Sequence, residues 1–196
     1  MRLVPLGILG SGKGSNCRAI LEGIKNGVLA AEVRVVISDV FDAPIIDIAR
    51  EFSVPNAYLP PGGFRTRLEP QAEVNLVQML RDAGVELVAL AGFMRVLKAP
   101  MLNAFPRRIV NIHPSLLPKF PGLEAWKQAL DAGEMLTGCT VHYVDEEIDH
   151  GDVIAQREVP ILADDTPERL HARIQVAEHE LYPAVIGQIC RQLQTA

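Results

Sequence analysis

Short apolar runs alternate with segments whose apolar residues recur every three to four positions through the first half of the chain. Residues 4–9 form such a run, and a helical pattern follows with apolar residues at Cys17, Ile20, Leu21 and Ile24. Residues 33–37, 87–91 and 109–112 are further runs, of the kind found in strands that are covered on both faces. The alternation predicts an α/β, Rossmann-like fold, with a mostly parallel sheet and helices on both faces.

The second half of the chain has a different pattern of expected strands and helices. Residues 137–144 and 153–159 have the composition of strands, and an acidic loop joins them, so we expect an antiparallel addition to the sheet. Thr166 and Pro167 then open a long C-terminal helix. Because neither an internal repeat nor a linker interrupts the 196 residues, we expect a single domain over residues 1–196.

Composition and charge exclude several classes of function. The formal net charge of −5 argues against a nucleic-acid-binding surface, which needs a basic excess. The three cysteines are far apart and form no CxxC pair, which favours reduced thiols in the cytoplasm over disulfides or a zinc site. Neither a signal-peptide pattern nor an apolar run of membrane-spanning length is present. We therefore expect a soluble, cytoplasmic protein with no membrane or nucleic-acid partner and no metal.

The glycine-rich turn after the first strand resembles two nucleotide-binding motifs without completing either. The phosphate-binding pattern GxxxxGK[ST] fails because Gly14 stands where the hydroxyl residue belongs, and GxGxxG fails because Ser15 replaces the third glycine. The remaining feature is a helix that opens with Gly14, Ser15 and Asn16, where free N–H groups and the helix dipole favour a monophosphate. The alternative is a tight turn in which Ser15 or Asn16 only caps the helix.

Asn111 and His113 fall on one face of a predicted strand end, and Asp149 lies in an acidic loop that could fold back over them. Pro114 holds His113 in an extended conformation. An amide and an imidazole can stabilise the oxyanion of an acyl transfer and relay a proton, and a nearby carboxylate favours the charged imidazole. The alternative is that His113 is a strand-end histidine bonded to a backbone carbonyl, and that the acidic loop is a solvated turn.

Several segments resemble the phosphoribosylglycinamide formyltransferases, which use a folate donor. These segments are 11–16, 91–97, 111–122, 138–142 and 175–179, in the order that this family shows and over essentially the whole chain. The resemblance implies a Rossmann-like formyltransferase fold. It also implies 10-formyltetrahydrofolate as the donor and glycinamide ribonucleotide as the acceptor, in purine biosynthesis.

The same resemblance implies roles for particular residues. Asn111, His113 and Asp149 would be catalytic, with His113 as proton donor and oxyanion stabiliser and Asp149 raising its pKa. The residues that would bind the ribonucleotide are Gly14, Ser15, Asn16, Gln175 and Glu178. The residues that would bind the folate are Arg67, Met94, Arg95, Val96, Leu97, Asn111, Asp145, Glu146, Glu147 and Ile148.

One departure from this family follows Leu123, where relatives often carry a histidine and this chain has Glu124, Ala125 and Trp126.

The nearest alternative function is a formyltetrahydrofolate hydrolase, which normally carries an extra N-terminal domain. A metal hydrolase is a second class, but its candidate ligands match no zinc spacing; they are His113, His142, Asp149 and His150. A non-catalytic nucleotide- or folate-binding module is a third class. A homodimer is also possible.

Overall fold

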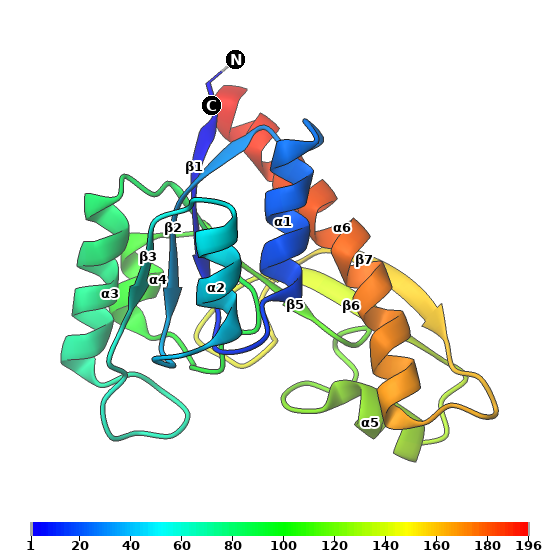
Figure 1. Cartoon of the computed structure of the whole chain (residues 1–196). Coiled ribbons are helices and arrows are strands. Elements are labelled where there is room, and N and C mark those ends of the chain that lie inside the picture. Colours follow the sequence, from blue (N-terminus) through cyan, green and yellow to red (C-terminus); the bar gives the residue numbers. More distant parts are fainter. Residues whose placement is uncertain (1, 196) are drawn as a thin grey trace.

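A seven-stranded sheet with the order β3-β2-β1-β4-β5-β6-β7 runs through the protein (Figure 1). The computed structural model describes residues 2–195. The strands are β1 (Val4–Leu9), β2 (Ala31–Ser38), β3 (Asn56–Tyr58), β4 (Leu87–Leu90), β5 (Ile109–His113), β6 (Leu136–Tyr143) and β7 (Val153–Pro160). The helices are α1 (Ser15–Lys25), α2 (Pro44–Glu51), α3 (Pro70–Asp82), α4 (Ala99–Ala104), α5 (Ala125–Asp131) and α6 (Pro167–Thr195).

The first five strands are parallel, and β6 and β7 are antiparallel to their neighbours. Helices α1, α2 and α6 cover one face of the sheet, and α3 and α4 cover the other. The predicted fold class, with its antiparallel addition in the C-terminal half, is therefore confirmed. The parallel strands β1, β4 and β5 end side by side, so the polar segments that follow them meet at one edge of the sheet.

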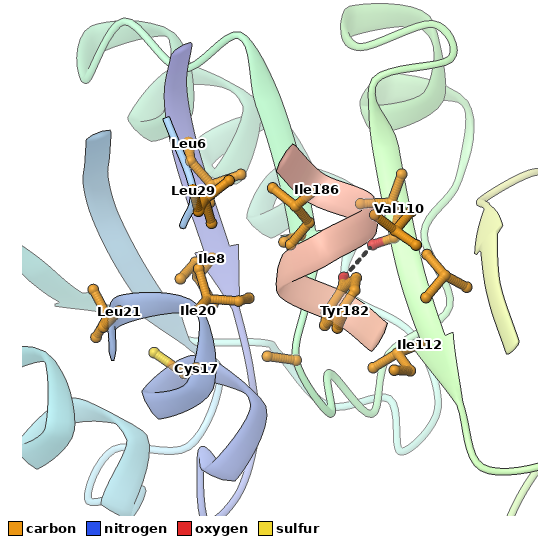
Figure 2. Packing of buried hydrophobic residues seen from close by; sticks show 14 of the residues in the cluster. Leu6, Ile8, Cys17, Ile20, Leu21, Leu29, Val110, Ile112, Tyr182 and Ile186 are labelled. Carbon is orange, nitrogen blue, oxygen red and sulfur yellow. Dashed lines mark hydrogen bonds between the residues drawn. The ribbon is translucent and has the colours of Figure 1, made fainter. Parts of the chain in front are cut away.

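Strand alternation divides the core into two clusters, one on each face of the sheet. On β5, Val110 and Ile112 pack in the cluster under α1 and α6, whereas Ile109 packs in the cluster under α3 and α4. Figure 2 shows Ile8 and Ile20 in the first of these clusters, close to α6. This alternation leaves the side chains of Asn111 and His113 on the face opposite to Ile112, as the sequence predicts.

The C-terminal helix is tied to the centre of the sheet by a buried tyrosine. The Tyr182 hydroxyl shares its hydrogen between the carbonyls of Leu90 (3.0 Å) and Val110 (2.9 Å), which belong to the adjacent strands β4 and β5. Figure 2 shows the bond to Val110. The phenol ring is fully buried. This contact fixes the position of the part of α6 that carries Gln175 and Glu178.

Two short helices differ from the sequence expectation. Neither α4, with six residues, nor α5, with seven, was predicted, because two turns or fewer give too little periodicity to read. Within residues 2–195, none of the helices combines the length and the apolar composition that crossing a membrane requires.

Replacing Tyr182 by phenylalanine should lower the free energy of unfolding by about 1–2 kcal/mol, because two buried carbonyls lose a donor. Urea unfolding measures the change. The matched control is Tyr58→Phe, whose ring is partly exposed, and this variant should unfold like the unmodified protein. Equal stability of the two variants would contradict the role of the Tyr182 hydroxyl.

Candidate active site

The catalytic candidates meet at the carboxyl end of β5. Asp149 Oδ2 lies 3.3 Å from His113 Nδ1, and Asp149 Oδ1 lies 3.5 Å from Asn111 Nδ2. Asp149 belongs to the loop between β6 and β7 and adopts a left-handed backbone conformation (φ 53°). The structure therefore brings the carboxylate of Asp149 to the imidazole of His113 and to the amide of Asn111, which lies 38 residues earlier in the chain.

A second histidine supports this group from the neighbouring strand. His142 pairs with Asn111 in the β5–β6 register, and its Nε2 lies 3.1 Å from Asn111 Nδ2 and 3.6 Å from Asp149 Oδ1. Its Nδ1 lies 2.8 Å from the carbonyl of Tyr143, which only accepts, so Nδ1 carries the hydrogen. In the neutral ring Nε2 then accepts one N–H of Asn111. The other N–H of Asn111 makes only the long contact with Asp149, which leaves it available to a ligand.

The backbone of residues 120–122 closes over the same side chains. His113 Nε2 donates to the carbonyl of Phe120 (2.8 Å), and the N–H of Gly122 donates to Asp149 Oδ2 (2.8 Å). Both Phe120 (φ 57°) and Gly122 (φ 83°) have left-handed backbone conformations, which turn these backbone groups towards the site. His113 is therefore bonded to a backbone carbonyl, as the alternative interpretation expects, and it also faces Asp149.

Opposing influences set the protonation of His113. Burial lowers its pKa, Asp149 and the Phe120 carbonyl raise it, and the result is a pKa below the ordinary value of 6.5. Since Nε2 carries the hydrogen given to Phe120, a second proton lies between Nδ1 and Asp149 when it is present. Asp149 favours the charged imidazole, as the sequence suggests, but burial outweighs this effect. The second proton is consequently bound weakly and is suited to transfer.

Asp149 itself remains ionised. Burial raises its pKa, but the neighbouring rings of His142 and His113 and the N–H of Gly122 together bring the pKa below its ordinary value of 3.8. A negative charge is thus maintained beside the His113 ring at neutral pH.

The glycine-rich turn places the start of α1 at the same edge of the sheet. Gly14 is the residue before the helix, with φ 75°, and a Cβ there would lie 2.9 Å from the backbone of Ile45. No side chain caps α1, so the capping role considered for Ser15 or Asn16 is not what the structure shows. The first-turn N–H groups, including those of Ser15 and Asn16, have no intrahelical acceptor and can meet an anion.

Glu178 approaches this helix start from α6. Asn16 Nδ2 donates to Glu178 Oε2 (2.9 Å), and Glu178 is buried, which raises its pKa to about 7 although the Asn16 bond opposes the shift. The buried Oδ1 of Asn16 finds no hydrogen-bond partner among the described residues. Gln175 lies half-buried on α6, three residues before Glu178. An unsatisfied buried acceptor beside a carboxyl that is easily protonated is typical of a ligand site.

A separate cavity of about 770 Å³ lies along the outer side of α1. It begins at Lys13 and Ser15 and ends near Val28, and residues of α2 and α6 form its walls. Asn111, His113 and Asp149 do not line it, so this cavity is not where the three side chains meet.

The segment after β4 lies beside the glycine-rich turn. Met94 is exposed and Val96 is half-buried, whereas Leu97 is buried in the core with only its backbone left for a ligand. Arg67 is exposed, stacks over the ring of Phe64 (4.0 Å to its centre), and its backbone bridges to Val96. The guanidinium of Arg95 is bonded to Asp39 and to the carbonyls of Phe64 and Arg65, so the backbone of this residue is what remains for a ligand.

The acidic loop supplies the last candidate group. Asp145 is half-buried and accepts the N–H of Glu147 (3.0 Å), while Glu146, Glu147 and Ile148 are exposed. In the part of the chain that the structure describes, no cluster of three or more histidine, cysteine or acidic residues is arranged to hold a metal ion.

Sequence reasoning missed two parts of this site. The backbone of Phe120 and Gly122 was not identified, although the proline and glycine residues that follow His113 mark a rigid turn there. Asp39 was also missed. Its position directly after β2 could have pointed to it, because ligands meet the carboxyl ends of parallel strands.

The fold and the site together define a family, and comparison with known proteins identifies it. The model of the formyl transferase family matches residues 4–186. The chain belongs to this family. It is 40% identical over 182 residues to the phosphoribosylglycinamide formyltransferase of Bacillus subtilis, covering 93% of this chain and 92% of that one.

Three further relatives extend the comparison. A glycinamide ribonucleotide transformylase 1 from Symbiobacterium toebii has a crystal structure that superposes with a TM-score of 0.93 at 45% identity, covering 97% of this chain and 89% of that one. The trifunctional purine biosynthetic protein adenosine-3 of Drosophila pseudoobscura pseudoobscura is 43% identical over 182 residues. This match covers 92% of this chain and only 13% of the fly protein. The corresponding protein of Drosophila melanogaster matches over 14% of its length.

The raised pKa of Glu178 predicts how stability depends on pH. The folded carboxyl, with a pKa of about 7, holds a proton that the unfolded one, near 4.5, releases, so stability falls as the pH rises between these values. A shift of this size corresponds to about 3 kcal/mol. Relative to Glu178→Gln, the unmodified protein should therefore lose up to that much free energy of unfolding between pH 5 and 8.

Urea titrations at several pH values test this prediction. Glu180→Gln is the control, because Glu180 forms an exposed ion pair with Arg157 and should leave the pH dependence unchanged. Parallel pH profiles of the unmodified protein and Glu178→Gln would contradict the prediction.

Proposed function

We propose that this protein transfers the formyl group of 10-formyltetrahydrofolate to the amine of glycinamide ribonucleotide, a step of purine biosynthesis. The observation that carries the proposal is the convergence of Asn111, His113 and Asp149 at the edge of the sheet where α1 begins. The names of relatives that match over most of their length support the same substrates. The chain spans 13% of the longer fly relative, so the activity of that whole protein is not transferred.

The proposed reaction begins when the acceptor amine attacks the formyl carbon and the C=O electron pair moves to oxygen. The free N–H of Asn111 stabilises this oxyanion. The Nδ1 proton of charged His113, which makes only a long 3.3 Å contact with Asp149, is shared with the oxyanion, while Nε2 stays bonded to Phe120. The attacking nitrogen then loses a proton, the bond from carbon to N10 of the folate breaks, and N10 takes up the electron pair and a proton. His113 with Asp149 relays this proton, which suits the weakly bound second proton described above.

The two substrates are assigned to opposite sides of this group. The first turn of α1 (Gly14, Ser15 and Asn16), with Gln175 and Glu178 from α6, receives the phosphate and ribose of the ribonucleotide. The folate lies along residues 94–97, with Arg67 at its tail, and residues 145–148 complete its other side. Asn111 lies between the two substrates.

The remaining features agree with a single catalytic unit. One sheet and its two core clusters run through the chain, so we treat residues 1–196 as one formyltransferase domain. The three cysteines are buried and free, which suits a reducing compartment such as the cytoplasm. The possible homodimer remains a prediction from the sequence.

A formyl-transfer assay with purified protein tests the proposed function. Formation of tetrahydrofolate should require both 10-formyltetrahydrofolate and glycinamide ribonucleotide, with each omitted in turn. Formate release without the ribonucleotide would instead identify a hydrolase, and no turnover with both substrates would reject the proposal.

Replacing His113 by glutamine or Asp149 by asparagine should lower kcat by about 100-fold or more, because each change removes a member of the proton relay. Steady-state kinetics measure the effect, and circular dichroism checks the fold. Asp152→Asn is the control, since Asp152 forms an exposed ion pair with Arg107 three residues from Asp149, and it should keep normal kinetics. A near-normal kcat in either active-site variant would reject the assigned roles.

A further inference from the structure

Asp39 is a buried carboxylate at the end of β2 that touches none of the proposed reacting groups. Its side chain is 1% exposed. Asp39 Oδ1 accepts the hydroxyl of Ser11 (2.5 Å), and Oδ2 accepts Nε of Arg95 (2.6 Å). Both of its oxygens are therefore occupied by donors from two other segments of the chain.

Ser11 connects this carboxylate to both halves of the site. It belongs to the glycine-rich turn that leads into α1, on the acceptor side. Its hydroxyl accepts the N–H of Met94 (2.8 Å), and its own N–H donates to the carbonyl of Gly92 (3.0 Å), so the same residue holds the segment on the donor side. Relative movement of the two segments would break these bonds.

Arg95 extends the connection to the loop before α3. Its Nη1 donates to the carbonyls of Phe64 (2.5 Å) and Arg65 (2.7 Å), and the neighbouring N–H of Val96 donates to the carbonyl of Thr66 (2.9 Å). The guanidinium is 15% exposed, and its bonds to Asp39 and the two carbonyls turn it into the protein. Only the backbone of Arg95 is then available to a folate, and its side chain holds the surrounding segments in place.

We infer that Asp39 is a positioning residue that sets the distance between the acceptor and donor sides of the site, acting through Ser11 and Arg95. This inference rests on the proposed function. Formyl transfer requires the amine nitrogen to be held close enough to the formyl carbon to attack it. A displacement of one substrate by about 1 Å lowers the rate on the order of 100-fold. A buried ion pair that is also hydrogen-bonded to two backbone carbonyls and to the Ser11 hydroxyl can hold such a distance rigidly.

The inference predicts a kinetic signature that general instability does not give. Asp39→Asn leaves Arg95 without its charge partner, and Arg95→Gln removes the bonds to the loop. Each should lower kcat/KM for the folate by about 10- to 100-fold, while KM for the ribonucleotide changes by less than about threefold. The double variant Asp39→Asn with Arg95→Gln should lose no more than the worse single variant, because the two residues act as one unit.

Two measurements keep the test independent of folding defects. Ser11→Ala removes one hydroxyl and no charge, and it should lower kcat/KM for the folate by about tenfold. Amide hydrogen exchange over residues 94–97 should become faster in Asp39→Asn than in the unmodified protein. Asp47→Asn is the matched control, because Asp47 forms an exposed carboxylate–guanidinium pair with Arg50 (2.9 Å) on α2 and should change neither quantity.

Three results would overturn the inference. One is normal folate kinetics in Ser11→Ala and in Asp39→Asn. Another is a loss of activity in proportion to the loss of folded protein, with KM for the folate and KM for the ribonucleotide both unchanged. The third is a double variant whose loss of kcat/KM for the folate equals the combined losses of the two single variants. If the unmodified protein shows no formyl transfer at all, the proposed function fails instead, so the two failures are distinguishable.

Discussion

The contact between Asp149 and the end of β5 is the interaction on which the whole site depends. Asp149 is drawn from a loop between two antiparallel strands, and it meets His113 and Asn111 only because β6 runs back along β5. The N–H of Gly122 binds the same carboxylate and so attaches the segment after His113 to it. One largely buried negative charge thereby orders three segments of the chain, and desolvation makes each of its contacts stronger than it would be in water.

Most of the framework could be predicted from the sequence. The strands and longer helices have clear periodicity, and the parallel arrangement follows from their alternation. The shared face of Asn111 and His113 follows from the two-residue repeat of a strand. The helix start at Gly14 follows from the glycine-rich turn after the first strand. The structure adds why glycine stands there, because a Cβ would lie 2.9 Å from the backbone of Ile45. Asp149 was placed near His113 by the family resemblance and by its loop, and the structure agrees.

What could not be predicted depends on long-range contacts or on backbone groups. The carbonyl of Phe120 and the N–H of Gly122 carry no side-chain signature, and Phe120 adopts its left-handed conformation without being a glycine. Asp39 and Arg95 are 56 residues apart and each reads as an ordinary surface charge, so the inward turn of the Arg95 guanidinium appears only in three dimensions. The net pKa of His113 was not predictable either, because burial is a property of the packed chain.

A crystal structure with tetrahydrofolate and formylated glycinamide ribonucleotide bound together tests the central claim most directly. We expect the formamide of the ribonucleotide product to face N10 of tetrahydrofolate, with its oxygen within about 3 Å of Asn111 Nδ2 and of His113 Nδ1. We also expect the phosphate to contact the first turn of α1. A formamide bound away from Asn111 and His113, or a phosphate seated elsewhere, would contradict the central claim.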